Sequence, residues 1–211
     1  MFNLSFDTAT TALVEFFPAG PTSQVAANSL AVNLPPRGTA ILNDVAGASG
    51  LNVSATGAIR ITSVATLVAT SRIYLNSTTG TFGQFVDAFP RSSALRRAVM
   101  PQVSNTLAPS GLRANAGFFN PTQANVTVRL EARNESGTLV GQNVITLAPL
   151  TQQQNAITGY FPGVDLSNAT NLTMSFDASA PIFGYVSQVD NLSGDSFLIP
   201  GQPDPGVATN Q

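Results

Sequence analysis

The letters DNLSGD at residues 190–195 put four oxygen-bearing side chains around one glycine-containing turn. Asp190, Asn191, Ser193 and Asp195 offer the carboxylate, amide and hydroxyl oxygens that Ca²⁺ prefers as ligands. The spacing fits no EF-hand loop, and turn-forming Asn, Ser and Gly explain the motif without an ion. We therefore favour a plain turn and keep these four residues as a calcium candidate.

Several of the residue types that most often carry out catalysis are missing from this sequence. It contains no His, Cys or Lys, so the usual nucleophile and base pairs of hydrolases cannot be assembled. A glycosidase needs two carboxylates that face each other across a cleft. The acidic residues are scattered singly, at Asp7, Glu15, Asp44, Asp87, Glu131, Glu135, Asp165, Asp177, Asp190, Asp195 and Asp204. We expect no enzyme and no cofactor.

Arginines gather near the middle of the chain, at Arg91, Arg96, Arg97 and Arg113. They suit a patch for an acidic glycan or an acidic partner protein. The alternative is structural: arginine at a domain junction packs its stem between domains and pairs with nearby carboxylates. We favour the structural role.

Asparagines in the pattern Asn-x-Ser/Thr are glycosylation acceptors in exported proteins of organisms that glycosylate. Eight occur, at Asn3, Asn52, Asn76, Asn125, Asn134, Asn168, Asn171 and Asn191. A chain rich in Ser, Thr and Asn produces several by composition alone, so both interpretations stay open.

Charge is scarce: 9% of the 211 residues are charged, 43% are hydrophobic, and the net charge is -2. Nucleic acid is an unsuitable partner, because its phosphates require a basic face. A surface with so few charges repels its neighbours weakly, which favours self-association. No run of about 20 apolar residues is long enough to cross a membrane.

In several segments of the chain, apolar and polar residues alternate with a period of two. In residues 125–133, NVTVRLEAR, the apolar residues fall on one face and the polar residues on the other, which predicts a half-buried strand. The same alternation recurs in residues 2–7, 30–34 and 172–177. Turn clusters separate these segments about every 8–12 residues, as in all-β sandwiches and barrels. We predict an all-β, antiparallel fold.

The first part of the sequence also aligns with the second part. With a shift of 113 to 115 positions, residues 31–43 align with 144–156 and residues 59–76 with 174–191, in the same order. This indicates an internal duplication and predicts two tandem immunoglobulin-like β-sandwiches. The expected division is repeat 1 at 1–88, a connector at 89–97, repeat 2 at 98–200, and a flexible tail at 201–211.

Repeat 1 begins almost at once with FNLSF, whereas a strand like that of residues 98–105 precedes the matching element of repeat 2. We therefore expect repeat 1 to lack its first strand, and an open edge is a template for another chain. Our hypothesis is that a neighbouring copy, with the tail after Pro200 as one source, fills this edge by strand addition. A short or loop-covered edge is the alternative.

Three segments carry a resemblance to a known group of proteins: SRIYLNSTTGTFGQF (71–85), NAGFFNP (115–121) and YVSQVDNLSGDSFLIP (185–200). Together they resemble the tandem immunoglobulin-like β-sandwich repeats of secreted and cell-surface proteins from Acidobacteria and related environmental bacteria. The resemblance implies an extracellular module without catalytic activity.

Two functions compete at this point. The first is a self-associating structural subunit of a filament, surface layer or adhesin stalk. The second is an accessory module that binds carbohydrate or protein within a larger secreted protein. The start of the chain lacks the charged region and apolar core of a signal peptide. Export followed by cleavage of such a peptide, and no export by that route, both stay open.

Overall fold

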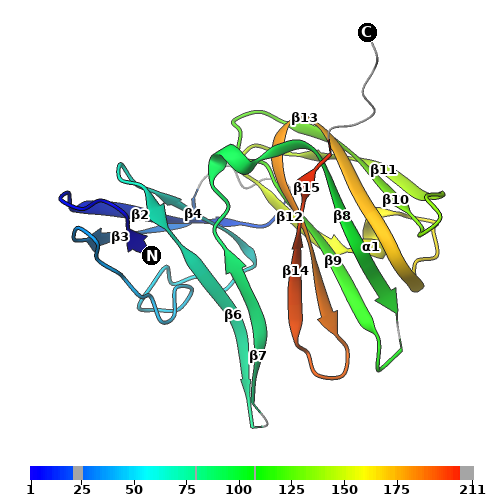
Figure 1. The fold of residues 1–211 in the computed structure, drawn as a ribbon, viewed down its shortest axis with the longest axis horizontal. Coiled ribbons are helices and arrows are strands. Elements are labelled where there is room, and N and C mark those ends of the chain that lie inside the picture. Colours follow the sequence, from blue (N-terminus) through cyan, green and yellow to red (C-terminus); the bar gives the residue numbers. More distant parts are fainter. Residues whose placement is uncertain (21–25, 79, 107, 205–211) are drawn as a thin grey trace.

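The computed structural model describes residues 1–20, 26–78, 80–106 and 108–204, and these residues form an antiparallel all-β protein, as the alternation predicts (Figure 1). The described part of residues 1–88 contains seven strands: β1 (Phe2–Asn3), β2 (Thr10–Pro18), β3 (Asn28–Leu34), β4 (Gly57–Thr62), β5 (Leu67–Val68), β6 (Thr70–Ser77) and β7 (Gly80–Asp87). Among the described residues, no helix has the length and apolar character needed to cross a membrane.

The second half forms a sandwich of two sheets. After a short 3-10 helix, η1 (Arg91–Ser93), its elements are β8 (Leu95–Thr106), β9 (Leu112–Phe119), β10 (Val126–Arg133), β11 (Leu139–Leu147), β12 (Gln152–Ala156), α1 (Ile157–Tyr160), β13 (Asn168–Asp190), β14 (Ser196–Pro200) and β15 (Gln202–Pro203). One sheet has the order β11-β10-β13-β8-β15, and β12-β9-β13-β14 forms the other. Strand β13 belongs to both sheets, because its first part pairs with β10 and its last part with β9.

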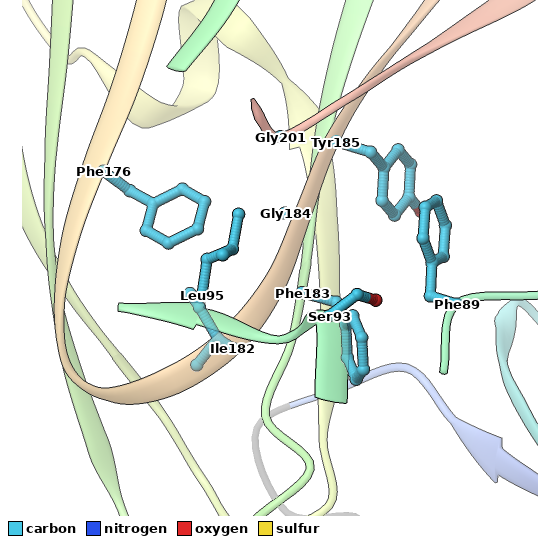
Figure 2. A pocket seen from close by; sticks show the side chains of 9 residues that line it. All are labelled: Phe89, Ser93, Leu95, Phe176, Ile182, Phe183, Gly184, Tyr185 and Gly201. Carbon is cyan, nitrogen blue, oxygen red and sulfur yellow. The ribbon is translucent and has the colours of Figure 1, made fainter. Parts of the chain in front are cut away.

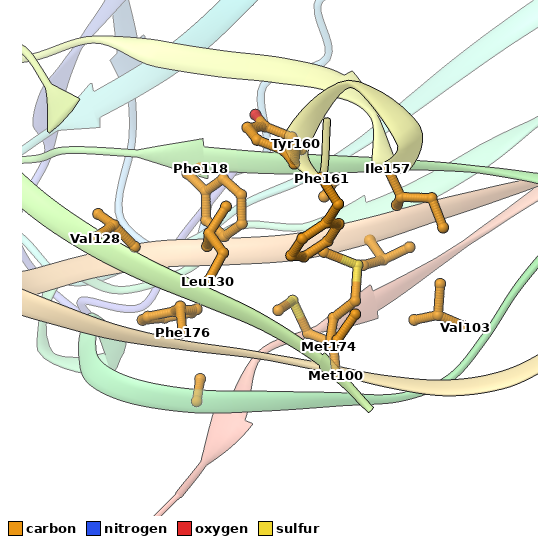
Figure 3. Packing of buried hydrophobic residues seen from close by; sticks show 14 of the residues in the cluster. Met100, Val103, Phe118, Val128, Leu130, Ile157, Tyr160, Phe161, Met174 and Phe176 are labelled. Carbon is orange, nitrogen blue, oxygen red and sulfur yellow. The ribbon is translucent and has the colours of Figure 1, made fainter. Parts of the chain in front are cut away.

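The core of this sandwich comes from the inward faces of the alternating strands. All four apolar positions of β10 are fully buried, from Val126 to Ala132, as the sequence predicts. The ring of Phe118 meets the rings of Tyr160 and Phe176 edge-on, at centroid distances of 5.4 and 5.9 Å (Figure 3). Edge-to-face contacts are a favoured arrangement for aromatic pairs. Twenty-one buried residues make up this one cluster.

The first half is less complete. Strands β3, β2 and β4 form a three-stranded sheet, β6 and β7 form a separate hairpin, and β1 pairs with β5. Their buried cluster consists of Val14, Phe16 and Leu51, with partly buried side chains around it. Residues 1–88 therefore bury far less apolar surface than the second half, and their folding has a weaker hydrophobic driving force.

Two buried asparagines make matching contacts in the two halves. Asn3 donates from Nδ2 to the carbonyl oxygens of Thr8, Leu34 and Pro35, and its Oδ1 accepts the backbone N–H of Ser5. In the second half, Asn120 donates in the same way to three carbonyls, those of Ala124, Leu147 and Ala148, and accepts the N–H of Thr122. This agreement favours the interpretation that the two halves are copies of one unit.

The pairing of the strands also corresponds between the two halves. Val14 of β2 lies opposite Leu30 of β3 and Ile61 of β4. In the second half, Leu130 of β10 lies opposite residue 143 of β11 and Phe176 of β13. On this alignment β2, β3 and β4 correspond to β10, β11 and the first part of β13, while the β6–β7 hairpin corresponds to the last part of β13 with β14.

Three details differ from the sequence prediction. Residues 2–7 are not an alternating strand: β1 ends at Asn3, whose side chain is fully buried, whereas Phe6 is 82% exposed. The reason is that Asn3 satisfies three backbone carbonyls, which a period-two pattern does not reveal.

The predicted boundaries shift as well. Strand β8 begins at Leu95, within the expected connector at 89–97. The expected tail at 201–211 starts with an ordered pair of residues, since β15 pairs with Val99 and Ala98 of β8. Residues 205–211 lie outside the described part of the chain.

Candidate functional site

The short strand β1 is bonded on both sides. On one side Met1 and Ala40 exchange hydrogen bonds, at 2.8 Å from the amino terminus to the Ala40 carbonyl oxygen and at 2.9 Å in return, and Phe2 bridges Thr39. On the other side Phe2 pairs with Val68 and Asn3 with Leu67. The N-terminal residues thus lie between two segments of their own half.

The equivalent place in the second half is the end of β9. Phe119 lies between Gln152 of β12 and Phe183 of β13, and the N–H of Asn120 bonds the carbonyl of Thr151 as the N–H of Asn3 bonds that of Gly38. Strand β1 therefore corresponds to the last residues of β9. The alignment places Met1 at the position of Phe118, and Met1 packs against the small core as Phe118 packs in the large one.

Beyond this point the halves differ. In the second half β9 continues back from Gly117 to Leu112, pairing with Gln154–Ala156 on one side and with Tyr185–Asp190 on the other. The matching segments of the first half are residues 41–43 and 70–75. Within the described residues neither segment has a strand partner on that side, and Ile41 is 78% exposed. We call residues 41–43 together with β6 the open edge.

The β6–β7 hairpin, which contributes β6 to the open edge, exposes large apolar side chains to solvent. Strand β6 pairs with β7 alone in the described part of the chain, which leaves its second edge unpaired. Ile73 and Leu75 of β6 are 66% and 68% exposed, and Phe85 of β7 is 61% exposed. An exposed, apolar strand edge is the feature through which sheets pair with other chains.

Strand β4 also has an edge without a strand partner among the residues that the structure describes. It pairs with β2, whereas the corresponding part of β13 pairs with β10 on one side and with β8 on the other. In the second half Met174 is fully buried, with Met100 of β8 as its pairing partner. Its counterpart in β4, Ile59, is 42% exposed.

The two halves meet through a row of aromatic rings. Phe17 of β2 meets Phe119 edge-on at 6.4 Å, Phe119 stacks on Phe183 at 6.4 Å, and Phe183 lies 6.1 Å from Phe89. Ala19 also bridges Gln152 in a parallel arrangement, and Gly20 donates to the Gln152 carbonyl. The first half is thereby attached to the outer face of the β12-β9-β13-β14 sheet.

Polar side chains lie within the same junction. The Tyr185 hydroxyl donates to Gln154 Oε1 at 2.6 Å and accepts from Gln152 Nε2 at 2.9 Å. Ser187 Oγ donates to Gln84 Oε1 at 3.3 Å. Gln84 Nε2 and Gln152 Oε1 are buried without a hydrogen-bond partner, which weakens this interface. Burial raises the pKa of Tyr185 above its ordinary value.

A small cavity lies beside two of these rings, Phe89 and Phe183 (Figure 2). Its walls include Phe89, Leu95, Ile182, Phe183 and Tyr185, which come from the connector, β8 and β13. It is too small for an organic ligand and is therefore not a candidate binding pocket.

The calcium candidates do lie around one turn, but several of their side-chain atoms form hydrogen bonds within the protein. Asp190 Oδ1 accepts the N–H and the hydroxyl of Ser193 and the N–H of Leu192, and these bonds hold the pKa of Asp190 below its usual value. Asn191 donates to two backbone carbonyls. Among the described residues no three acidic side chains gather in a metal-binding cluster.

The four arginines do not share a partner. Arg97 forms an ion pair with Asp177, at 3.3 Å, and Arg96 donates to the carbonyl of Ser179. Arg113 donates to Asn191 in the other sheet, beside the turn between β13 and β14, while Arg91 lies in η1. Of these arginines Arg97 alone has a carboxylate partner among the printed ion pairs of the described residues, and the structural role stays a prediction.

The glycosylation candidates differ in exposure. Asn3 is fully buried, so the folded chain does not offer it as an acceptor. The exposed members are Asn52, Asn76, Asn125, Asn168 and Asn171, and the half-buried ones are Asn134 and Asn191. Modification of these sites stays a prediction.

Sequence reasoning anticipated an open edge but not its extent. It expected one missing strand, whereas the alignment of β1 with the end of β9 leaves residues 1–88 without counterparts of both β8 and most of β9. The signal was present in the sequence: FN at residues 2–3 matches FN at 119–120. That match aligns the first residues of the chain with the end of a strand rather than with its beginning.

No protein-family model matches the chain, and no curated protein matches it. Among solved structures, the chain is similar to a crystal structure of Thermotoga maritima 1070, with 12% sequence identity and a TM-score of 0.43. The similarity covers 54% of this chain and 98% of that one.

Proposed function

We propose that this protein is a non-catalytic structural protein of the cell exterior, a self-associating subunit of a surface assembly such as a filament, surface layer or adhesin stalk. The observation that carries the proposal is the pair of strand edges in residues 1–88 that have no strand partner within the described part of the chain, with Ile41, Ile59, Ile73 and Leu75 beside them.

Free energy favours covering such a surface. Burying apolar area stabilises an association by roughly 25 cal/mol per Å², and pairing a strand edge satisfies its backbone N–H and C=O groups at the same time. With 9% charged residues, copies of the chain repel one another weakly. The absence of His, Cys and Lys from the sequence supports a role without catalysis.

The test is the oligomeric state of the purified chain as its concentration rises. We expect light scattering after size exclusion to show species larger than the 211-residue monomer, and electron microscopy to show ordered polymers. The variant Ile73→Lys places a charge beside the edge of β6 and should shift the equilibrium toward monomer, because a desolvated unpaired charge is costly.

The matched control is Val64→Lys, since Val64 is 98% exposed in the same half but lies outside the strands. This variant should associate as the unmodified chain does. A strict monomer at high concentration contradicts the proposal. Dispersed particles with measurable affinity on a glycan array favour the accessory binding module instead.

A further inference from the structure

Strand β6 is exposed on both of its faces. Every residue from 70 to 76 is exposed, and the β6–β7 hairpin extends beyond the sheet of β3, β2 and β4 (Figure 1). We propose that β6 pairs antiparallel with β6 of a second copy, about a two-fold axis between the two Tyr74 residues, and so forms a continuous sheet β7-β6-β6-β7. This inference rests on the proposed function and names the geometry of one of its contacts.

The hydrogen bonds of the hairpin show which backbone groups of β6 point outward. The N–H of Ala88 donates to the carbonyl of Ala69, and this pair continues the β6–β7 register by one step. Bonded and non-bonded pairs alternate in an antiparallel ladder, so Ile73 and Leu75 direct their N–H and C=O groups toward β7. Tyr74, which lies between them, directs its own toward the free edge.

Strand β7 agrees with this pattern. Gly83 lies opposite Tyr74, and its N–H points away from β6 and donates to Asp195 Oδ1. The outward backbone groups of β6 therefore belong to Arg72, Tyr74 and Asn76, and they face no strand in the described part of the chain. A second β6 satisfies all of them when Tyr74 lies opposite the partner's Tyr74 and Arg72 opposite the partner's Asn76.

The apolar side chains suit this register. Directly opposite residues of an antiparallel pair lie on the same face of the sheet, so Ile73 meets the partner's Leu75 and Leu75 meets the partner's Ile73. These side chains are 66% and 68% exposed in the single chain. On the other face of the sheet the two Tyr74 rings meet. Pairing thus brings together apolar groups that a single chain leaves in water.

Charge distinguishes this register from its nearest alternative. Pairing Ile73 with the partner's Ile73 also satisfies the outward groups, but it places the two Arg72 residues at diagonal positions about 7–8 Å apart, where like charges repel. With the axis at Tyr74, the two arginines lie four residues apart along the ladder, or roughly 13 Å. Each then faces an uncharged asparagine and keeps its contact with the Tyr74 ring of its own chain, at 5.3 Å from the centroid.

The symmetry of this contact limits what it can build. A two-fold interface uses the same surface on both copies and is complete when two copies have met. Strand β6 therefore joins copies in pairs. The edge of β4, which faces no strand among the described residues, is not used in the pair. A longer polymer requires that second edge in addition to β6.

Disulfide cross-linking tests the register, because the chain has no cysteine of its own. With oxidised glutathione as the oxidant, Tyr74→Cys should give covalent dimers, since Cα atoms of a bonded pair lie about 5.5 Å apart, within reach of a disulfide. Arg72→Cys and Asn76→Cys should each stay unlinked alone and should link when mixed. Val64→Cys is the control, exposed but outside the strands, and should not link.

A second pair of variants tests the backbone of the edge. Proline is tolerated in an edge strand where its missing N–H would face solvent, so Tyr74→Pro should fold. It removes one hydrogen bond from each copy and should weaken dimerisation by about tenfold relative to Tyr74→Thr, which lacks the same ring but keeps the N–H. Size exclusion with light scattering over a concentration series measures both.

The outcomes distinguish this inference from the proposed function. The absence of covalent Tyr74→Cys dimers, cross-linking of Ile73→Cys in their place, or equal dimerisation of the proline and threonine variants overturns the β6 pairing, even when the chain forms polymers. Covalent Tyr74→Cys dimers, with Arg72→Cys and Asn76→Cys linking only as a mixture, support the pairing. They do so even when growth stops at the dimer, a result that contradicts the ordered polymer and leaves the β6 contact standing.

Discussion

Asn3 and Asn120 hold equivalent corners of the two halves: each side chain bonds three backbone carbonyls, and each accepts an N–H two residues further along the chain. The carbonyl of Leu34 or Leu147, at the end of the neighbouring strand, is among the three in each case. A loop that precedes a strand is thereby tied to the strand beside it. The buried amide satisfies groups that would otherwise be left without partners.

Replacement of either asparagine by alanine should destabilise its own half. We expect Asn120→Ala to lower the free energy of unfolding by about 1–3 kcal/mol, because buried carbonyls lose their donors. Asn3→Ala should act mainly on the first half. Urea unfolding measures the effect, and Asn125→Ala, at an exposed position, is the control that should stay near the unmodified value. Equal midpoints for Asn120→Ala and Asn125→Ala contradict this role.

Gly117 allows Tyr185 to lie flat across β9. A methyl group at residue 117 would overlap the ring of Tyr185. Gly117→Ala should therefore displace that ring, break its bonds to Gln152 and Gln154, and lower the melting temperature by several degrees, as about 1–3 kcal/mol of overpacking does. The matched control is Gly159→Ala in α1, because a methyl group there makes only an ordinary van der Waals contact. Its melting temperature should equal or exceed that of the unmodified chain.

Alkaline pH should destabilise the second half through two tyrosines. Burial raises the pKa of both Tyr160 and Tyr185 in the folded chain, while the unfolded value is about 10. Their contribution is therefore intact below about pH 10 and is lost as the pH rises above it, because the unfolded state releases these protons first.

Tyrosinate absorbance and unfolding free energy, measured together across this range, check the sign. The chain has three Tyr and no Trp, which keeps the absorbance signal simple. The double variant Tyr160→Phe with Tyr185→Phe should lose most of the alkaline slope. A slope that persists in this variant assigns the effect to other groups.

The contact between Arg60 and Glu15 should depend on guanidinium geometry. Arg60 bonds both carboxylate oxygens and also lies over the Phe17 ring, 4.7 Å from its centroid. Arg60→Lys keeps the charge but loses the fork and the planar stacking, so we expect a loss of about 0.5–1 kcal/mol for this partly exposed pair. Thermal unfolding measures it. Arg91→Lys is the comparison, and equal losses in the two variants contradict a geometric role.

The sequence predicted the fold class because period-two alternation is local. Strands such as β10 and the first part of β13 bury the residues that the pattern assigns to the core. Residues 2–7 show the limit of that reasoning, since Asn3 is buried and Phe6 is exposed. Burial of Asn3 depends on carbonyls of Leu34 and Pro35, and no local pattern contains such a contact.

The sequence pattern did not predict the extent of the open edge either. It depends on whether the first residues of the chain begin a strand or end one, and hydrophobic period alone does not distinguish the two. The pairing of Phe2 with Val68, next to Thr39 on its other side, decides the matter. The separate partners of Arg97 and Arg113 likewise follow from their places in two different sheets.

Strand β13 gives the second half an unusual mechanical character. It runs for 23 residues through both sheets, and it pairs with β8, β9, β10 and β14 along its length. Tension on this strand is shared by four neighbours, whereas tension on the β6–β7 hairpin is resisted by a single ladder. Under load the molecule should yield at its first half long before the second gives way.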